Sequence, residues 1–292
     1  MREIPPDSRS QTATISELLS RGETLLQGTT PDPRREARLL LRHASGLGDA
    51  QIMAFPERQL TAAEAERYLA WVRRRARHEP IAHLLGWRDF RQLSLRVDAN
   101  TLIPRPETEL LVDLALDLMP AGGVRALDLG TGSGAIALCL ADERPAWSVS
   151  ASDESAAALS VARDNAQRLG LKLRLLEGDW FEPVTGERFD LIVSNPPYIP
   201  EQDPHLAQGD LPHEPRTALA AGDDGLDDLR RIIREAPAQL TPNGRLMLEH
   251  GHDQGPAVRA LLDAAGLIEI ATHRDLAGRE RISTARRGGD TG

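Results

Sequence analysis

The hydrophobic residues of the first part of the chain repeat with the period of an α-helix. Five of them form one stripe at helical spacing, namely Ile15, Leu18, Leu19, Leu25 and Leu26. Asp32 followed by Pro33 is a typical helix start, and Thr61 with Glu64 is the sequence pattern of a capping box. Because no stretch here alternates like a strand, we expect residues 1–85 to form a small helical bundle.

The segments on either side of this bundle carry different patterns. Residues 1–10 are polar, and we expect a loose tail there. After the bundle, apolar and polar residues alternate at Leu93, Ser94, Leu95, Arg96 and Val97. This alternation predicts a short strand or hairpin. We therefore expect residues 86–106 to connect the bundle to a second domain at residues 107–292.

Strand and helix patterns alternate from Val124 onward. Strands are predicted at 124–128, 148–152, 172–177, 189–194, 244–249, 267–272 and 280–285. Helical patterns fill the gaps at 134–142, 155–169, 225–240 and 253–265. Seven strands with intervening helices predict an α/β fold with a mainly parallel, doubly wound sheet. The last strand follows a short loop rather than a helix, so we expect it to run antiparallel.

A glycine-rich turn follows the first of these strands. Gly130 and Gly132 permit a tight turn and a close approach of the backbone to a ligand. Asp153 lies 21 residues after Gly132, at the end of the next strand, where a carboxylate can accept both ribose hydroxyls of an adenosine. The segment also reads as G-x-G-x-x-A, ending at Ala135, which fits a dinucleotide site. The turn thus predicts a cofactor that contains adenosine and leaves its identity open.

Two residues after the third strand extend this predicted site. Asp179 can hydrogen-bond to an adenine amino group, and Trp180 can cover the base. Open α/β sheets bind ligands at the carboxyl ends of their strands. We therefore expect both residues to line the cofactor site.

An Asn-Pro-Pro-Tyr motif follows the fourth strand, at residues 195–198. The two prolines fix φ and remove two N–H donors, which leaves the carbonyl of Pro196 free to face a ligand. Together with the side-chain oxygen of Asn195, it makes two rigid acceptors that match the two hydrogens of an –NH2 group. Such acceptors favour the charged nitrogen of a methyl-transfer transition state. We predict Asn195, Pro196 and Tyr198 to be catalytic and, with Pro197, to bind the substrate, Tyr198 by stacking on a flat amide or base.

The charge of the chain argues against direct binding of nucleic acid. The net charge is -9, whereas phosphate binding needs a basic surface. Residues 1–100 contain 16 arginines, no lysine and 13 acidic residues, and the remainder contains 19 basic and 31 acidic residues. A DNA adenine-N6 methyltransferase, whose exocyclic amine would suit the same Asn-Pro-Pro-Tyr motif, is disfavoured on this ground.

Other classes are disfavoured by what the sequence lacks. Cys139 is the only cysteine, so a disulfide within the chain and a thiolate metal site are excluded. The histidines are scattered, and we expect no bound metal. The polar N-terminus has no apolar signal core, and no run of 18 apolar residues occurs. We expect a cytoplasmic protein that does not contact a membrane.

With these motifs the chain resembles the PrmC/HemK family, the methyltransferases of the catalytic glutamine in class 1 peptide release factors. The resemblance covers nearly the whole chain. Its most specific part is the Pro-Arg-Pro-Glu-Thr-Glu string within residues 102–109. Further strings that resemble the family lie at residues 79–86, 210–215, 222–226 and 275–279.

This resemblance implies a helical substrate-recognition domain and a Rossmann-like catalytic domain. It implies S-adenosyl-L-methionine as cofactor, S-adenosyl-L-homocysteine as product, and N5 methylation of the glutamine in a release factor's Gly-Gly-Gln loop. We expect the protein to act as a monomer. The candidate cofactor-binding residues are Gly130, Thr131, Gly132, Ser133, Gly134, Asp153, Asp179, Trp180 and Asn195.

Three alternatives stand beside this interpretation. A sister branch, which methylates a glutamine of a large-subunit ribosomal protein, shares the Asn-Pro-Pro-Tyr motif but typically lacks the Pro-Arg-Pro-Glu-Thr-Glu string. A nicotinamide-dependent dehydrogenase would fit the glycine turn but would leave the two prolines unexplained. A regulatory protein with an inactive site is disfavoured by the intact motif at residues 195–198.

Overall fold

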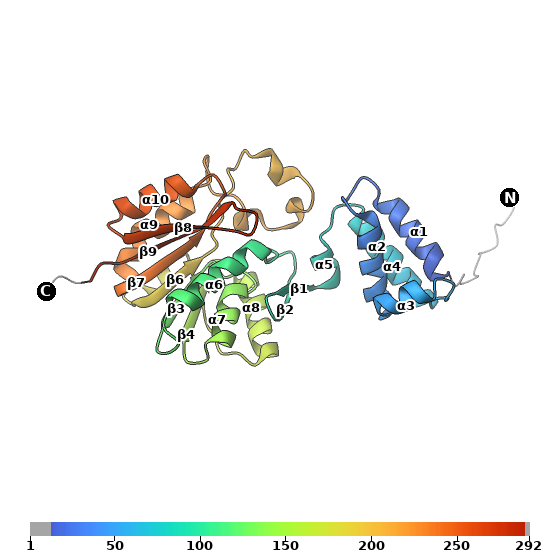
Figure 1. Ribbon diagram of the computed structural model, residues 1–292, viewed down its shortest axis with the longest axis horizontal. Coiled ribbons are helices and arrows are strands. Elements are labelled where there is room, and N and C mark those ends of the chain that lie inside the picture. Colours follow the sequence, from blue (N-terminus) through green and yellow to red (C-terminus); the bar gives the residue numbers. More distant parts are fainter. Residues whose placement is uncertain (1–12, 290–292) are drawn as a thin grey trace, which may run out of the picture. The chain divides into compact units, whose positions relative to one another are not determined.

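The structure, a computed structural model, describes residues 13–289 and divides into two compact units between Leu85 and Gly86 (Figure 1). The tail predicted at residues 1–10 lies outside the described residues. Over the described range, no helix is long and apolar enough to cross a bilayer.

The first unit is a bundle of helices, as the helical periodicity predicts. Its helices are α1 (Ile15–Leu26), α2 (Pro33–Ser45), α3 (Asp49–Ala54), α4 (Ala62–Arg75) and α5 (Ile81–Leu85). Capping boxes start two of them, with Thr14 and Glu17 at α1 and Thr61 and Glu64 at α4, and they satisfy backbone N–H groups that have no partner within the helix. Leu25, at the edge of the predicted apolar stripe, is 40% exposed, so the buried face of α1 is narrower than that stripe.

The second unit begins with the hairpin that the alternating pattern predicts. Strand β1 (Trp87–Phe90) pairs antiparallel with β2 (Leu93–Arg96). A 3-10 turn (Pro106–Thr108) then leads into α6 (Glu109–Leu118). The buried residues of β2 belong to the same hydrophobic core as those of α6, so the hairpin packs on the second unit.

A seven-stranded sheet forms the centre of this unit. Its strands are β3 (Arg125–Leu129), β4 (Ser148–Asp153), β5 (Arg174–Glu177), β6 (Phe189–Ser194), β7 (Leu240–Glu249), β8 (Ile268–Arg274) and β9 (Glu280–Arg286). The order is β5-β4-β3-β6-β7-β9-β8, and β9 runs in the direction opposite to the other six strands. The predicted parallel sheet and antiparallel last strand are confirmed. The insertion of β9 between β7 and β8 has no counterpart in the sequence pattern.

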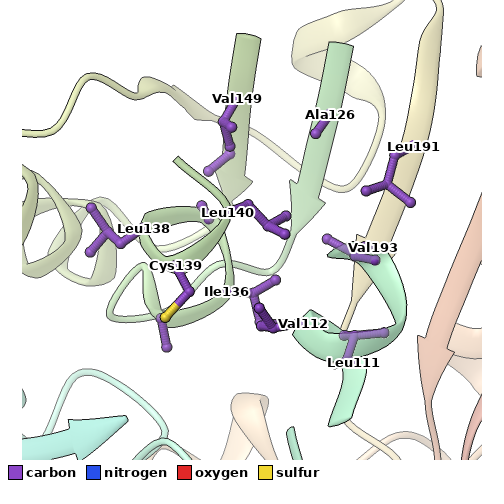
Figure 2. Close-up of a cluster of buried hydrophobic side chains, with 14 of the residues drawn as sticks. Leu111, Val112, Ala126, Ile136, Leu138, Cys139, Leu140, Val149, Leu191 and Val193 are labelled. Carbon is purple, nitrogen blue, oxygen red and sulfur yellow. The ribbon is translucent and has the colours of Figure 1, made fainter. Parts of the chain in front are cut away.

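Helices cover both faces of the sheet. They are α6 together with α7 (Ala135–Glu143), α8 (Ala156–Leu169), α9 (Asp227–Gln239) and α10 (Gly255–Ala264). In Figure 1, α6, α7 and α8 lie on one face and α9 and α10 on the other. Neighbouring residues of β3 accordingly face two cores, Ala126 the first and Leu127 the second. Figure 2 shows the first core, in which Cys139 of α7 is fully buried among apolar side chains.

The largest departure from the predicted strand bounds is in β7. This strand begins at Leu240 rather than at residue 244. Its register with β6 shifts between the pair Phe189–Leu240 and the pair Leu191–Arg245, so residues 241–244 bulge outward opposite a single residue of β6. A sequence of Thr-Pro-Asn-Gly is typical of a turn, which explains why the pattern hides the start of this strand.

The contact between α1 and α4 provides a test of the helical bundle. Gly22 of α1 faces Tyr68 of α4, and a Cβ at Gly22 would overlap the Tyr68 hydroxyl. We expect Gly22→Ala to destabilise the bundle by about 1–3 kcal/mol, although alanine normally favours a helix over glycine. Amide hydrogen exchange in α1 and α4 of the full chain measures the loss.

The matched control is Tyr68→Phe, because it removes only the overlapping oxygen. That hydroxyl is buried and has no hydrogen-bond partner within residues 13–289. The single Tyr68→Phe variant is expected to be nearly as stable as the wild type. The double variant is expected to regain part of the stability lost with Gly22→Ala, because the ring carbon Cζ would still lie 2.9 Å from the added Cβ. Strictly additive effects of the two substitutions would contradict this packing.

Candidate functional site

The carboxyl ends of four neighbouring parallel strands, β5, β4, β3 and β6, meet at one edge of the sheet and open into a cavity of about 380 Å³. This volume lies in the range of small-molecule sites, which is about 300–1,000 Å³. The wall is formed by residues after these strands, by residues 99–108 before α6, by residues 215–218 and by the start of α9. Ligands of open parallel sheets bind at this edge, so the topology and the cavity point to the same place.

The glycine turn forms the floor of the cavity. Gly130, Gly132 and Gly134 have φ of 67°, 55° and 85°, a left-handed conformation that strongly favours glycine. At Gly130 a Cβ would also lie 3.2 Å from the ring of Trp180. Thr131 and Ser133 line the cavity between the glycines. The turn therefore brings bare backbone to the cavity wall.

Asp153 is held against this turn. Its two carboxylate oxygens accept hydrogen bonds from the backbone N–H groups of Gly132 (2.8 Å) and Ser155 (2.9 Å). Burial raises the pKa of Asp153, and the two backbone bonds partly oppose the shift. Each oxygen keeps a further lone pair, and the residue lines the cavity. Asp153 is thus placed to accept hydrogen bonds from a diol.

Asp128 is a buried carboxyl that the sequence analysis did not single out. The Thr131 hydroxyl (2.6 Å) and the Ala137 backbone N–H (3.3 Å) both donate to its Oδ2. Its Oδ1 has no hydrogen-bond partner in the described part of the chain. Burial raises the pKa of Asp128 to about 7. The available signal was a lone aspartate between two leucines, just before the glycine turn.

Asp179 and Trp180 line the cavity together with residues from the start of α9. Arg231 donates to the carboxylate of Asp179 at 2.6 Å. The Trp180 side chain hydrogen-bonds to Asp228, whose pKa is raised by burial and lowered by that bond. Trp180 has a positive φ of 46°, a conformation that is uncommon for residues other than glycine. Arg231 and Asp228 carry no local sequence motif, and sequence reasoning missed them.

The Asn-Pro-Pro-Tyr motif brings Asn195 and Pro197 into the cavity wall. The Asn195 side-chain Nδ2 donates to the Thr108 hydroxyl at 3.2 Å. Within residues 13–289, no hydrogen bond occupies the carbonyl of Pro196. Tyr198 turns its hydroxyl to Glu249 at the end of β7, at 3.2 Å. The start of the motif thus lines the cavity, and its last residue, Tyr198, contacts a buried carboxyl.

Two loops over the cavity are tied together by Glu214. Its side chain is fully buried, accepts the backbone N–H of Ile103 at 2.8 Å and forms an ion pair with Arg105. The strings at residues 102–109 and 210–215 are therefore in contact. Leu102 and Pro104 from the first loop and Pro215 from the second line the cavity. No group of three or more potential metal ligands gathers within residues 13–289.

A doubly wound sheet with a glycine turn, a following acid and an Asn-Pro-Pro-Tyr motif at its carboxyl edge is the arrangement of a Rossmann-like methyltransferase. Known families match two parts of the chain, the PrmC N-terminal domain over residues 17–86 and the methyltransferase small domain over residues 107–214. A methyltransferase crystal structure from Pyrococcus furiosus is similar in fold, with a TM-score of 0.53 at 20% identity, over 71% of this chain and 93% of that chain.

Closer relatives define the family. A release factor glutamine methyltransferase from Xylella fastidiosa (strain Temecula1) is 52% identical over 87% of this chain and 93% of that protein. The protein of the same name from Escherichia coli (strain K12) is 49% identical over 87% of this chain and 92% of its own length. The chain belongs to the release factor glutamine methyltransferase family.

The raised pKa of Asp128 predicts how stability depends on pH. The folded state holds the proton up to about pH 7, whereas the unfolded carboxyl loses it near its ordinary pKa of 3.8. Between these values unfolding releases a proton, so stability falls as pH rises by about 1.4 kcal/mol per pH unit. Asp128→Asn lacks this proton, and its free energy of unfolding should decline less steeply from pH 4 to 7.

The measurement is the free energy of unfolding of both proteins, determined by urea unfolding at several pH values. Hydrogen exchange in β3 is then measured as a second, local readout. The contributions of other carboxyl groups cancel in the difference between the two proteins. Parallel stability curves would mean that Asp128 ionises normally in the folded state.

Proposed function

We propose that this protein transfers the methyl group of S-adenosylmethionine to the side-chain amide nitrogen of the glutamine in the Gly-Gly-Gln motif of a class 1 release factor. The observation that carries the proposal is the Asn-Pro-Pro-Tyr motif, whose Asn195 lies in the cavity wall and whose Pro196 carbonyl makes no hydrogen bond among the described residues. Relatives at about half identity are named as enzymes of this reaction.

The residues around the glycine turn fit the cofactor. The bare backbone at Gly130 and Gly132 allows close approach, and Asp153 is placed to accept the two ribose hydroxyls. Trp180 covers the base, and Asp179 accepts from its amino group while Arg231 holds the carboxylate in place. When bound, S-adenosylmethionine supplies the activated methyl group.

The substrate amide is oriented by Asn195 and Pro196. An amide nitrogen is a weak nucleophile because its lone pair is delocalised into its carbonyl. Two acceptors on its N–H groups favour the pyramidal nitrogen that develops positive charge, and one such preorganised contact contributes roughly a hundredfold in rate. Alignment of the nitrogen with the methyl group supplies much of the remaining acceleration. The methylated nitrogen then releases its proton to water.

The same proposal assigns roles to the rest of the chain. Residues 1–85 recognise the release factor. Residues 86–106 connect the two domains and contribute to the cavity wall, and residues 107–292 supply the other residues that hold the cofactor and the glutamine. Every proposed site residue comes from one chain, so a monomer suffices. A translation factor as substrate places the reaction in the cytoplasm.

The test is to incubate the purified protein with labelled S-adenosylmethionine and an unmodified release factor, and to locate the methyl group by peptide mass spectrometry. We expect it on the Gly-Gly-Gln glutamine, and we expect no transfer when that glutamine is replaced. Asn195→Ala should reduce kcat by about a hundredfold or more with the fold intact. Transfer to a ribosomal protein or to DNA instead would overturn the choice of substrate.

The role of Asp153 predicts a defect in cofactor binding. Asp153→Asn keeps the size of the side chain but loses an acceptor for the ribose hydroxyls. We expect the Kd for S-adenosylmethionine, measured by calorimetry, to rise about tenfold or more, since hydrogen bonds to a charged group contribute about 1.5–3 kcal/mol. Asp164→Asn on the exposed surface of α8 is the matched control and should bind normally. Equal affinity of the Asp153→Asn variant would exclude the ribose role.

A further inference from the structure

Glu249 is a buried carboxyl that has no role in the proposed chemistry described above. It ends β7 beside the Asn-Pro-Pro-Tyr segment and is 1% exposed. The Tyr198 hydroxyl donates to its Oε1 at 3.2 Å. Its Oε2 makes no hydrogen bond of regular geometry to any residue in the range 13–289. A carboxyl held this far from water is costly to ionise, so its retention next to the substrate-binding motif calls for an explanation.

Thr108 connects this carboxyl to Asn195. The Thr108 side chain is buried, and its hydroxyl accepts a hydrogen bond from Asn195 Nδ2 at 3.2 Å. The same hydroxyl interacts with the Glu249 carboxyl and lowers its pKa. The open Oε2 of Glu249 is therefore available to accept the single hydroxyl proton of Thr108.

The direction of these hydrogen bonds depends on the charge of Glu249. An ionised carboxylate can only accept, so the hydroxyl of Thr108 donates to it and has only lone pairs left for Asn195. Asn195 must then point its –NH2 group to Thr108 and its oxygen the other way. A protonated Glu249 can donate to Thr108 instead. Thr108 is then free to donate to the Asn195 oxygen, which would turn the –NH2 group of Asn195 toward the substrate.

We propose that Glu249 is a positioning residue, which in its ionised form acts through Thr108 to keep the side-chain oxygen of Asn195 facing the glutamine amide. This inference rests on the proposed function and explains why the oxygen of Asn195, rather than its –NH2 group, faces the substrate amide. The Tyr198 hydroxyl, bound to the other oxygen of Glu249, holds the end of the same motif in place. Glu249 is not among the residues that line the cavity.

The groups around Glu249 set its pKa, and therefore the pH above which Asn195 is held in this orientation. Burial raises its pKa most, and the carboxylate of Glu107, before α6, raises it further. The hydroxyls of Thr108 and Tyr198 and the charge of Arg281, on β9, lower it. The net pKa is about 7. Because the ionised form is the positioning form, the rate of methyl transfer should rise with pH through this value.

The experiment measures kcat and KM for an unmodified release factor, and the Kd for S-adenosylmethionine, between pH 5.5 and 8.5. For the wild type we expect kcat to fall toward tenfold per pH unit below about pH 7. Glu249→Gln keeps the size but can donate to Thr108, so kcat at pH 8 should drop on the order of 10- to 100-fold and lose its dependence on this ionisation. Cofactor affinity should change less than about twofold.

Variants of the linking residue separate positioning from a general effect on folding. Thr108→Val should lower kcat and abolish its pH dependence, whereas Thr108→Ser should retain both. In the Thr108→Val background, Glu249→Gln should reduce kcat much less than it does in the wild type. Glu269→Gln is the matched control, because Glu269 is exposed near the start of β8, at the opposite edge of the sheet, and it should behave like the wild type. A folded Glu249→Gln enzyme with the wild-type pH profile would overturn the inference.

A measurement without substrate distinguishes failure of this inference from failure of the proposed function. In the labelled full chain, the side-chain –NH2 resonances of Asn195 should shift with the ionisation of Glu249, and this titration should be absent in Thr108→Val. Resonances that do not follow Glu249 would refute the link even if the wild type methylates the glutamine. A wild type that titrates as expected but transfers no methyl group would refute the proposed function and leave the link intact.

Discussion

The cost of removing carboxyl groups from water is the constraint on which the organisation of this site depends. Asp128 and Glu249 end or nearly end central strands, and both are buried with only a few donors to compensate them. Burial dominates the pKa of each, which is why both values lie near 7. Because a buried polar group that is only partly satisfied is costly, the partners of these two carboxyls need rigid positions. The surrounding loops provide that rigidity.

Those loops are fixed by side chains that cross long stretches of sequence. Asn165 of α8 bonds to both backbone groups of Arg96 in the hairpin and to the carbonyl of Ser133 in the glycine turn. Glu214 performs the same task for the loop that contains Ile103 and Arg105. One buried amide, Asn165, thus fixes the position of the glycine turn, and one buried carboxylate, Glu214, fixes the loop at residues 102–109. Neither residue needs to touch a ligand to affect how the cavity is shaped.

Much of the fold could be predicted from periodicity, because burial on one face imposes the period of each element. The parallel strands, the glycine turn and the spacing to Asp153 follow from local sequence. The Asn-Pro-Pro-Tyr motif carries its own backbone restriction, so its rigidity was also predictable. The bulge in β7 was hidden because Pro242, Asn243 and Gly244 look like a turn.

The side-chain network around the site could not be predicted from periodicity, and the physical reason differs from that for the bulge. Periodicity states which face of an element is buried, but it does not state which distant residues meet there. Thr108 and Asn195 are 87 positions apart, and Tyr198 and Glu249 are 51 apart. Asp128 occupies an inward position of β3, where a polar residue looks like an exception to the pattern rather than a functional group. Such exceptions in an apolar strand are the local sign that sequence reasoning can use.

The two kinds of residue also differ in what they contribute to the chemistry. In the proposed function, the motif at residues 195–198 supplies the atoms that face the substrate, and its backbone geometry is set within four residues. The polarity of an amide side chain is not set in this way, because its oxygen and nitrogen ends have nearly the same shape. Only a partner that can act in one direction distinguishes them, and an ionised carboxylate is such a partner. In the proposed positioning role, the unfavourable burial of Glu249 is offset by its effect on Asn195, whose acceptor oxygen is oriented before the substrate binds.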